Sequence, residues 1–361
     1  MKCIRIVFIL PSLAGGGAEK VLLNLLDNID DFRFEPYLIL LNDHGPLKPK
    51  LNKKNIIVLN KVRMRNSFFS LIREIKSLKP EVIFSTFPHI TLPLLFIKNS
   101  FFKKTKFITR EPNMLDKSLD NSPYSFLIKI LHKFYSNRSN KIIVTSKMMK
   151  KDFLKRGIKE NKLALVSNPI DYKKLRKIDF LKRHKGEGLR LVFVGRLVYQ
   201  KGIDRVIPLL KSNHNIHLTI IGDGPYKERV NKLVNKYNLY KQVKFLGFLY
   251  NANEYVAAAD YCILPSRWEG LPNVALESLI LGTPVLTFQE VVGLYDIKSN
   301  VSDKKLIFFK DEKEMAENLS NLMQRVDWKK PNLRKSLINN FNDPKEYSQK
   351  IEKIIMEEIL G

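Results

Sequence analysis

The chain has 361 residues, of which 44% are hydrophobic and 27% charged, so it can form two or three globular domains with large cores. No apolar run approaches the roughly 18 residues that a membrane-spanning helix needs. The two cysteines and six histidines lack the spacing of a disulfide framework or a zinc site, which favours a reducing cytoplasm.

The net charge of +27 is distributed unevenly along the chain. Residues 1–185 contain 38 Lys and Arg against 15 Asp and Glu, whereas the remaining residues contain 25 against 21. This difference predicts two domains with different partners, and the basic half could face anionic lipid, an acidic glycan or nucleic acid. A merely soluble surface in a lysine-rich composition is the alternative.

Short apolar runs alternate with amphipathic stretches in the first half. Helices are expected over Glu19–Asn28, Phe68–Leu78 and Ser122–Tyr135. Lys2 and Arg5 loosely imitate the start of a signal peptide, but a buried strand that runs into glycines is the favoured interpretation. The expected strands are Ile4–Leu10, Pro36–Leu41, Ile56–Leu59, Val82–Phe84, Phe107–Thr109, Ile142–Val144 and Leu163–Val166.

A polar linker over residues 171–188 interrupts this pattern, which then restarts and ends in a helix over Pro344–Leu360. The later strands are expected at Leu191–Val194, Leu218–Ile221, Val243–Leu246, Tyr261–Leu264, Val285–Phe288 and Leu306–Phe309. The alternation predicts two doubly wound α/β domains, residues 1–170 and 189–343, facing a central cleft. Residues 344–361 are expected to pack back on the first domain.

Three glycine-containing loops follow predicted strands. They read Gly15-Gly-Gly-Ala-Glu19, Gly195-Arg-Leu-Val-Tyr-Gln-Lys-Gly202 and Gly222-Asp-Gly-Pro225. Glycine lets a ligand approach the backbone closely, and Arg196 and Lys201 could neutralise a diphosphate. The alternatives are tight turns and solvated surface charge, since neither a dinucleotide fingerprint nor a P-loop is present.

The segment Arg267–Val285 is the most informative part of the sequence. It places Glu269 in a loop and Glu277 on the first or second turn of a helix that begins near Pro272. Free amides and a positive helix end suit phosphate, whereas carboxylates accept from hydroxyl groups, so this combination suits a nucleotide sugar. Because the chain has no Asp-x-Asp pair, Arg196 and Lys201 would have to replace a metal ion at the diphosphate.

These motifs resemble those of the retaining GT-B glycosyltransferases of family 4. The resemblance rests on GRLVYQKG, IGDGP and EGLPNVALE, with GGGAE and the turn Asn168–Asp171 in support. It implies two Rossmann-like domains and a metal-independent transfer in which the nucleotide sugar, expected to be a UDP-sugar on family frequency, is a substrate and no cofactor is needed.

The resemblance also implies roles for individual residues. Arg196 and Lys201 would bind the donor diphosphate, Glu277 the ribose, and Glu269 the transferred sugar. Further backbone contacts would come from Gly16, Gly17, Gly195, Gly222, Gly224, Gly270 and Leu271. Two loops depart from the family pattern: Arg110 and Glu111 stand where a histidine is common, and Val291–Asp296 lacks the usual glycine pair.

The acceptor is expected in the basic half. Lys98–Phe107 and Arg63–Phe69 interleave aromatic and basic residues, which suits an anionic membrane surface, although a phenylalanine core with a lysine rim is equally compatible. The sequence therefore predicts a peripheral enzyme at the cytoplasmic face of the membrane that acts on a lipid-linked glycan or a lipopolysaccharide or capsule intermediate. The alternatives are a nucleic-acid-binding protein, for which no specific motif is present, and a GT-B epimerase or phosphorylase.

Overall fold

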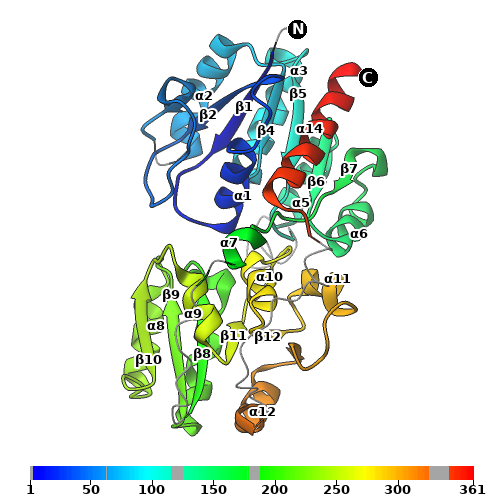
Figure 1. The fold of residues 1–361 in the computed structure, drawn as a ribbon. Coiled ribbons are helices and arrows are strands. Elements are labelled where there is room, and N and C mark those ends of the chain that lie inside the picture. The colour runs from blue at the N-terminus through cyan, green and yellow to red at the C-terminus, as the bar shows by residue number, and fades with distance from the viewer. Residues whose placement is uncertain (1–2, 62, 115–124, 177, 179–187, 325–340) are drawn as a thin grey trace. The chain divides into compact units, whose positions relative to one another are not determined.

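The computed structural model describes residues 3–61, 63–114, 125–176, 178, 188–324 and 341–361. The chain divides into two compact units (Figure 1). Unit 1 comprises Met1–Pro169 together with Asn342–Gly361, and unit 2 comprises Ile170–Phe341. In the part of the chain that is described, no helix is both long enough and apolar enough to cross a membrane.

Unit 1 contains a parallel sheet of seven strands in the order β3-β2-β1-β4-β5-β6-β7. The strand order reverses between β1 and β4, and ligands of such sheets bind beyond the carboxyl ends of the strands at this point. The strands are β1 (Ile4–Leu10), β2 (Phe34–Leu40), β3 (Ile56–Val58), β4 (Val82–Ser85), β5 (Lys106–Arg110), β6 (Lys141–Val144) and β7 (Leu163–Leu165).

Helices cover both faces of this sheet (Figure 1). One apolar core joins the sheet to α1 and α14, and a second core joins its other face to α2 and α3. The helices are α1 (Gly17–Leu26), η1 (Lys53–Asn55), α2 (Met64–Leu78), α3 (Pro88–Phe101), α5 (Ser125–Ser136), α6 (Lys147–Lys155), η2 (Glu160–Lys162) and α14 (Pro344–Leu360).

Helix α14 begins at Pro344, directly after the capping residue Asp343. The Asp343 carboxylate accepts from the Glu346 amide at 2.9 Å, and the Glu346 carboxylate accepts from the Asp343 amide at 3.0 Å, which forms a capping box ahead of Pro344. Tyr347 and Ile351 of α14 belong to the same core as α1. The C-terminal helix is therefore an integral part of unit 1.

Unit 2 contains a parallel sheet of six strands in the order β10-β9-β8-β11-β12-β13, which reverses between β8 and β11. Its strands are β8 (Leu189–Val194), β9 (Ile216–Ile221), β10 (Val243–Gly247), β11 (Tyr261–Leu264), β12 (Val285–Phe288) and β13 (Leu306–Phe309). Its helices are α7 (Tyr172–Arg176), η3 (Tyr199–Lys201), η4 (Ile203–Arg205), η5 (Ile207–Ser212), α8 (Lys227–Lys236), α9 (Ala252–Ala258), α10 (Asn273–Ile280), η6 (Val292–Leu294), α11 (Tyr295–Lys298) and α12 (Glu312–Gln324).

The predicted fold class of two doubly wound α/β domains is confirmed, and each predicted strand overlaps an observed one. Helix starts differ slightly from expectation: α8 begins two residues after Pro225, and Pro272 caps α10 from outside. Leu175 of α7, at the start of the predicted linker, is 3% exposed and belongs to the core of unit 2. Residues 177 and 179–187 of that linker lie outside the described residues.

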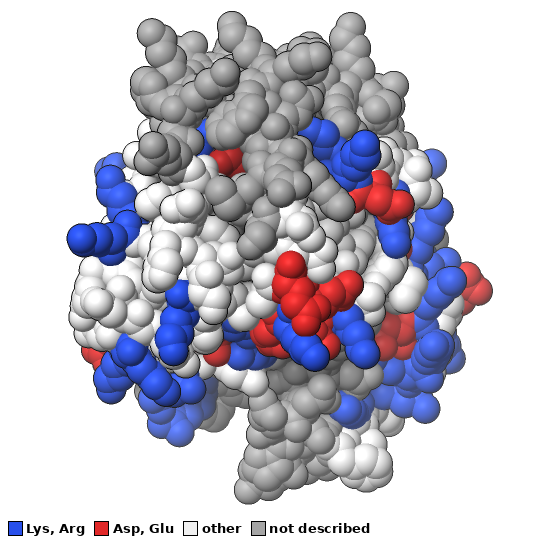
Figure 2. Space-filling model, turned by 90° about the horizontal axis from the view of Figure 1, so that it is seen from below, with Lys and Arg blue, Asp and Glu red and all other residues white. Residues whose placement is uncertain are grey.

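Charged side chains of both signs lie on the face of the molecule that Figure 2 shows. Basic side chains are spread around this face, and a group of acidic side chains lies nearer its middle. On this face, therefore, carboxylates interrupt the basic side chains.

Candidate functional site

Two loops leave neighbouring strands at the point where the strand order of unit 2 reverses. Residues 195–202 follow β8, and residues 265–272 follow β11, which pairs with β8. The first loop carries Arg196 and Lys201, and the second carries Glu269. Because this is the position at which parallel α/β sheets bind ligands, both loops mark the candidate site.

Lys201 and Glu269 form an ion pair between these loops. The Ser266 hydroxyl donates a second hydrogen bond to the same carboxylate oxygen of Glu269 at 3.0 Å. Glu269 is only 5% exposed, so it depends on Lys201 for charge neutralisation. The pair therefore fixes a cation and a carboxylate at the mouth of the sheet.

Glycines allow the surrounding loops to pack backbone against backbone. A side chain at Gly222 would collide with the carbonyl oxygen of Gly195, and one at Gly293 would collide with that of Gly270. These contacts join the loops after β8, β9, β11 and β12. The second contact places the loop Val291–Asp296, which departs from the family pattern, directly against the Glu269 loop.

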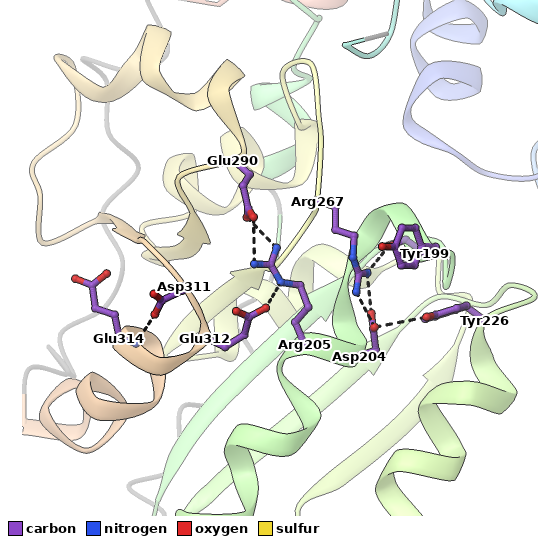
Figure 3. Close-up of polar contacts among 9 residues, drawn as sticks. All are labelled: Tyr199, Asp204, Arg205, Tyr226, Arg267, Glu290, Asp311, Glu312 and Glu314. Carbon is purple, nitrogen blue, oxygen red and sulfur yellow. Dashed lines mark hydrogen bonds and ion pairs between the residues drawn. The ribbon is translucent and has the colours of Figure 1, made fainter. Parts of the chain in front are cut away.

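Arg267 connects three of these loops (Figure 3). Its guanidinium donates to both carboxylate oxygens of Asp204, at 2.9 and 2.8 Å, and to the carbonyl oxygen of Tyr199 at 2.6 Å. It also stacks 3.9 Å from the centre of the Tyr199 ring, and the Tyr226 hydroxyl lies 3.5 Å from Asp204. Burial alone would lower the pKa of Arg267, but the bonds to Asp204 raise it above its ordinary value.

Arg205, which follows Asp204 in η4, forms a second clamp (Figure 3). Its Nη1 donates to Glu290 at 2.8 Å, and its Nε donates to Glu312 at 2.5 Å. Its charge lies 3.8 Å from the centre of the Phe288 ring. Burial opposes the charge, but the two carboxylates outweigh this effect and raise the pKa of Arg205. The start of the loop after β12 is therefore tied to α12.

The structure brings several predicted donor residues together. Lys201 meets Glu269, and its stem passes over Gly195, where an added Cβ would lie 3.7 Å from the lysine Cδ. Arg196 is exposed on the same loop, and Glu277 is partly buried on α10. Leu271 contributes to the core, with 5% of its surface exposed. The individual ligand contacts of these residues remain predictions.

In unit 1, the predicted glycines lie at the carboxyl end of β1. Gly16 caps α1, and Gly17 is its first residue. The Glu19 carboxylate folds back over Gly16, so a side chain at Gly16 would have to displace it. A Cβ on Gly17 would meet nothing within 4 Å. The start of α1 is therefore exposed at Gly17, and contact of these glycines with a ligand stays a prediction.

Arg110 and Glu111 are both buried at the end of β5. Arg110 is 2% exposed, and its Nη2 donates to the Asn168 side chain at 2.6 Å. Tyr347 lies near Arg110, whose positive charge partly offsets the burial that raises the pKa of this tyrosine. Arg110 thus connects β5 to Asn168, near the end of the first stretch of unit 1. It also connects β5 to α14, the helix that completes unit 1. Its predicted role toward the acceptor remains a prediction.

Glu111 has a histidine neighbour that the sequence analysis missed. Nε2 of His132, on α5, lies 3.6 Å from the Glu111 carboxylate, and Nδ1 lies 3.4 Å from the Ser136 hydroxyl. His132 is 1% exposed. The loop that lacks the family's usual histidine thus packs against a histidine from a helix 21 residues later in the chain. No local sequence pattern could have revealed this contact.

Neither cysteine chemistry nor a metal centre is evident among the residues that the structure describes. They contain no group of three or more His, Cys, Asp or Glu side chains that could hold a metal ion. Burial raises the pKa of Cys262 to about 12, which keeps its thiol protonated and unreactive. Metal independence remains a prediction of the resemblance.

Two family models match successive parts of the chain. Glycosyltransferase Family 4 matches residues 15–174, and Glycosyl transferases group 1 matches residues 176–343. The amylovoran biosynthesis glycosyltransferase AmsD of Erwinia amylovora is 24% identical over 78% of this chain and 80% of that protein. A Campylobacter jejuni protein, named as an N-acetylgalactosaminyltransferase acting on a diphospho-undecaprenol glycan, is 24% identical over 87% of this chain and 88% of that protein.

A solved structure shares the fold. Anabaena HepE in complex with UDP and glucose has a TM-score of 0.75 at 18% identity, covering 98% of this chain and 99% of that one. Together with the two parallel α/β units, this likeness defines a GT-B fold. The two family models match nearly the whole chain between them, and the chain belongs to family 4 of the GT-B glycosyltransferases.

Proposed function

We propose that the protein transfers a sugar, with retention of its anomeric configuration, from a UDP-sugar to a lipid-linked glycan that serves lipopolysaccharide, O-antigen or capsule synthesis. The observation that carries the proposal is the Lys201–Glu269 pair between the two loops at the reversal point of unit 2. UDP is proposed because Anabaena HepE was solved with UDP. The lipid-linked acceptor is proposed by analogy with the Campylobacter jejuni relative.

In this proposal, the cations and amides of unit 2 replace a metal ion. Arg196, exposed beside Gly195, and Lys201 neutralise the charge that develops on the leaving diphosphate. Glu269, held by Ser266 and Lys201, accepts from hydroxyl groups of the transferred sugar. Glu277 binds the ribose from α10. The acceptor hydroxyl attacks the anomeric carbon from the same face of the sugar that the diphosphate leaves, and the leaving phosphate takes the hydroxyl proton. The anomeric configuration is therefore retained.

The preferred location is the cytoplasmic face of the membrane, with the protein bound peripherally. The basic composition of residues 1–185 supports attraction to anionic lipid headgroups. A lipid-linked acceptor also requires the enzyme to work at a bilayer surface. Specific recognition of nucleic acid has no support in the fold or in the site.

The test is a transfer assay with purified full-length protein, candidate UDP-sugars and a lipid-linked acceptor, in the presence of a chelator. We expect turnover without added metal and a product whose anomeric proton coupling matches that of the donor. Loss of turnover in the chelator, restored by a divalent ion, would contradict metal independence. An inverted product would contradict retention, and transfer from another nucleotide sugar alone would contradict UDP.

A further inference from the structure

The helical layer that includes α2, α3 and α5 presents large apolar side chains to solvent. Phe69 is 83% exposed, Phe126 is 77% exposed and Phe96 is 60% exposed. Exposed apolar side chains that gather in one place usually mark an interaction site. We call this the aromatic face; its members are Phe69, Phe96, Phe101, Phe126, Ile130, Leu131 and Phe134.

Side-chain contacts join the three helices into one surface. The rings of Phe96 on α3 and Tyr135 on α5 lie 5.5 Å apart, and Arg138 donates to the Phe96 carbonyl oxygen at 3.2 Å. Lys76 of α2 lies 3.9 Å from the centre of the Phe101 ring at the end of α3. The exposed rings therefore belong to neighbouring helices.

The face is framed by basic residues. On α2, Arg65 and Arg73 stand four residues before and after Phe69, which places all three on one stripe of the helix. Lys103 and Lys104 are exposed directly after α3. Together, α2, α3 and α5 contain six Lys and Arg, of which Lys98 points inward, but one acidic residue, Glu74, which pairs with Arg73 at 3.2 Å.

The segments Lys98–Phe107 and Arg63–Phe69, in which aromatic and basic residues alternate, contain both surface and core residues. Phe102 is 5% exposed and Phe107 is 1% exposed, so both are core. Lys98 points inward and donates to the Arg138 carbonyl oxygen at 2.8 Å and to Asn140 at 2.7 Å. Phe69 and Phe101 face solvent instead. Each segment thus contributes both to the core and to the aromatic face.

We propose that the aromatic face docks on a bilayer that contains anionic lipid. Phenylalanine, isoleucine and leucine side chains insert at the boundary between headgroups and acyl chains, while lysine and arginine meet anionic headgroups. The near absence of carboxylates on these helices favours a negatively charged surface, and the exposed rings favour one with an accessible apolar layer. A bilayer offers both features, whereas a nucleic acid offers only the charge.

The position of the face fits the proposed function, on which this part of the inference rests. Helix α3 follows β4 and α5 follows β5, so both helices begin at the carboxyl edge of the sheet. Phe126 lies in the first turn of α5, so the aromatic face reaches that edge. A lipid-linked acceptor could therefore keep its lipid in the bilayer while its glycan enters unit 1.

Vesicle flotation with the full-length protein tests the docking surface. We expect binding to phosphatidylcholine vesicles that contain about one third phosphatidylglycerol, and weaker binding as salt is raised. A variant with Phe126→Ser, Phe134→Ser, Lys103→Glu and Lys104→Glu should bind at least about tenfold more weakly. The matched control, Tyr240→Ser with Lys241→Glu and Lys244→Glu, changes an exposed aromatic residue and exposed lysines of unit 2 and should bind like the unaltered protein.

Three results would overturn the docking surface: no binding of the unaltered protein to anionic vesicles, unchanged binding of the aromatic-face variant, or equal loss in the control. Sugar transfer to a water-soluble acceptor analogue, measured in parallel, separates this outcome from the proposed function. Sugar transfer without vesicle binding would contradict the docking proposal and leave the proposed function intact. Vesicle binding without transfer to any acceptor would sink the proposed function and leave the surface in place.

Discussion

Arg110 and Lys98 of unit 1 are surrounded differently from the cations at the donor loops of unit 2. In unit 2, Lys201, Arg205 and Arg267 each pair with carboxylates. In unit 1, the buried Arg110 donates to the amide oxygen of Asn168, and Lys98 donates to neutral oxygens of Arg138 and Asn140.

At the donor loops of unit 2, carboxylates of the protein itself neutralise the cations. Each of these ion pairs of unit 2 joins two segments, so the loops of the candidate donor site are held in place before a ligand arrives. In unit 1, Nε and Nη1 of Arg110 are buried with no hydrogen-bond partner among the described residues. Buried donors without partners are costly, and a ligand that satisfied them would gain affinity. The donor loops of unit 2 are thus held in place by ion pairs, whereas two buried donors of Arg110 in unit 1 have no partner among the described residues.

The largest expected effect comes from breaking the Lys201–Glu269 pair. Lys201→Ala should lower turnover by about 100- to 1,000-fold because it removes a charge aimed at the leaving group. It should also lower the free energy of unfolding by about 3 kcal/mol, since Glu269 stays buried without its partner. Steady-state kinetics and denaturant unfolding measure the two effects.

A double variant separates stability from catalysis at this pair. Lys201→Ala combined with Glu269→Gln should recover much of the lost stability, because the buried charge is gone, but none of the turnover. Recovery of both would mean that the pair acts only on the fold.

A smaller effect is expected from the clamp on the donor loops. Arg267→Ala removes the bonds to Asp204 and Tyr199, so the loops lose part of their preorganisation, and the KM for the donor should rise about tenfold. Arg267→Lys should not restore it, because lysine cannot bind Asp204 in a bidentate manner. Lys232→Ala, an exposed cation on α8, is the control, and an equal rise in KM there would refute the clamp.

A substitution at Arg110 in unit 1 should affect binding of the acceptor and not of the donor. Arg110→Met removes the buried guanidinium while keeping an unbranched stem, and it should raise the KM for the acceptor several-fold, roughly threefold to tenfold, with the KM for the donor unchanged. Initial rates with each substrate varied in turn measure both constants. A change confined to the KM for the donor would contradict the contrast between the two units.

The smallest expected effect is a change in pH dependence. Burial, reinforced by nearby Lys162 and Lys106, lowers the pKa of Lys98 from 10.5 to about 8. Between these values the unfolded chain binds more protons than the folded one, so Lys98 makes the free energy of unfolding rise with pH. Lys98→Met should remove this contribution from unfolding curves recorded across that range. The exposed Lys103→Met should leave the rise intact, and an unchanged profile in Lys98→Met would contradict the assignment.

The fold could be predicted because its strands are buried runs bounded by glycine, proline or polar residues. Ile4–Leu10 and Tyr261–Leu264 were predicted with the observed boundaries for this reason. Helix α3 was not predicted as a helix. It contains Pro93 and is apolar around much of its circumference, so it lacks a clear amphipathic pattern.

The donor loops could also be located from sequence, because glycine and proline mark the ends of parallel strands. The ion pairs that connect these loops to one another could not be predicted from sequence. Asp204 and Arg267 are 63 residues apart, and Arg205 and Glu290 are 85 apart, so only the folded sheet brings them together. Ser266 was overlooked because a serine near a strand end has many ordinary roles.

The central claim is that unit 2 binds a nucleotide diphosphate with its own cations. Calorimetric titration of the full-length protein with UDP in the presence of a chelator tests it most directly. We predict binding without metal, weakened about tenfold or more by Arg196→Ala, since a bidentate contact to phosphate is lost. Binding that requires a divalent ion, or that is unchanged in Arg196→Ala, would contradict the claim.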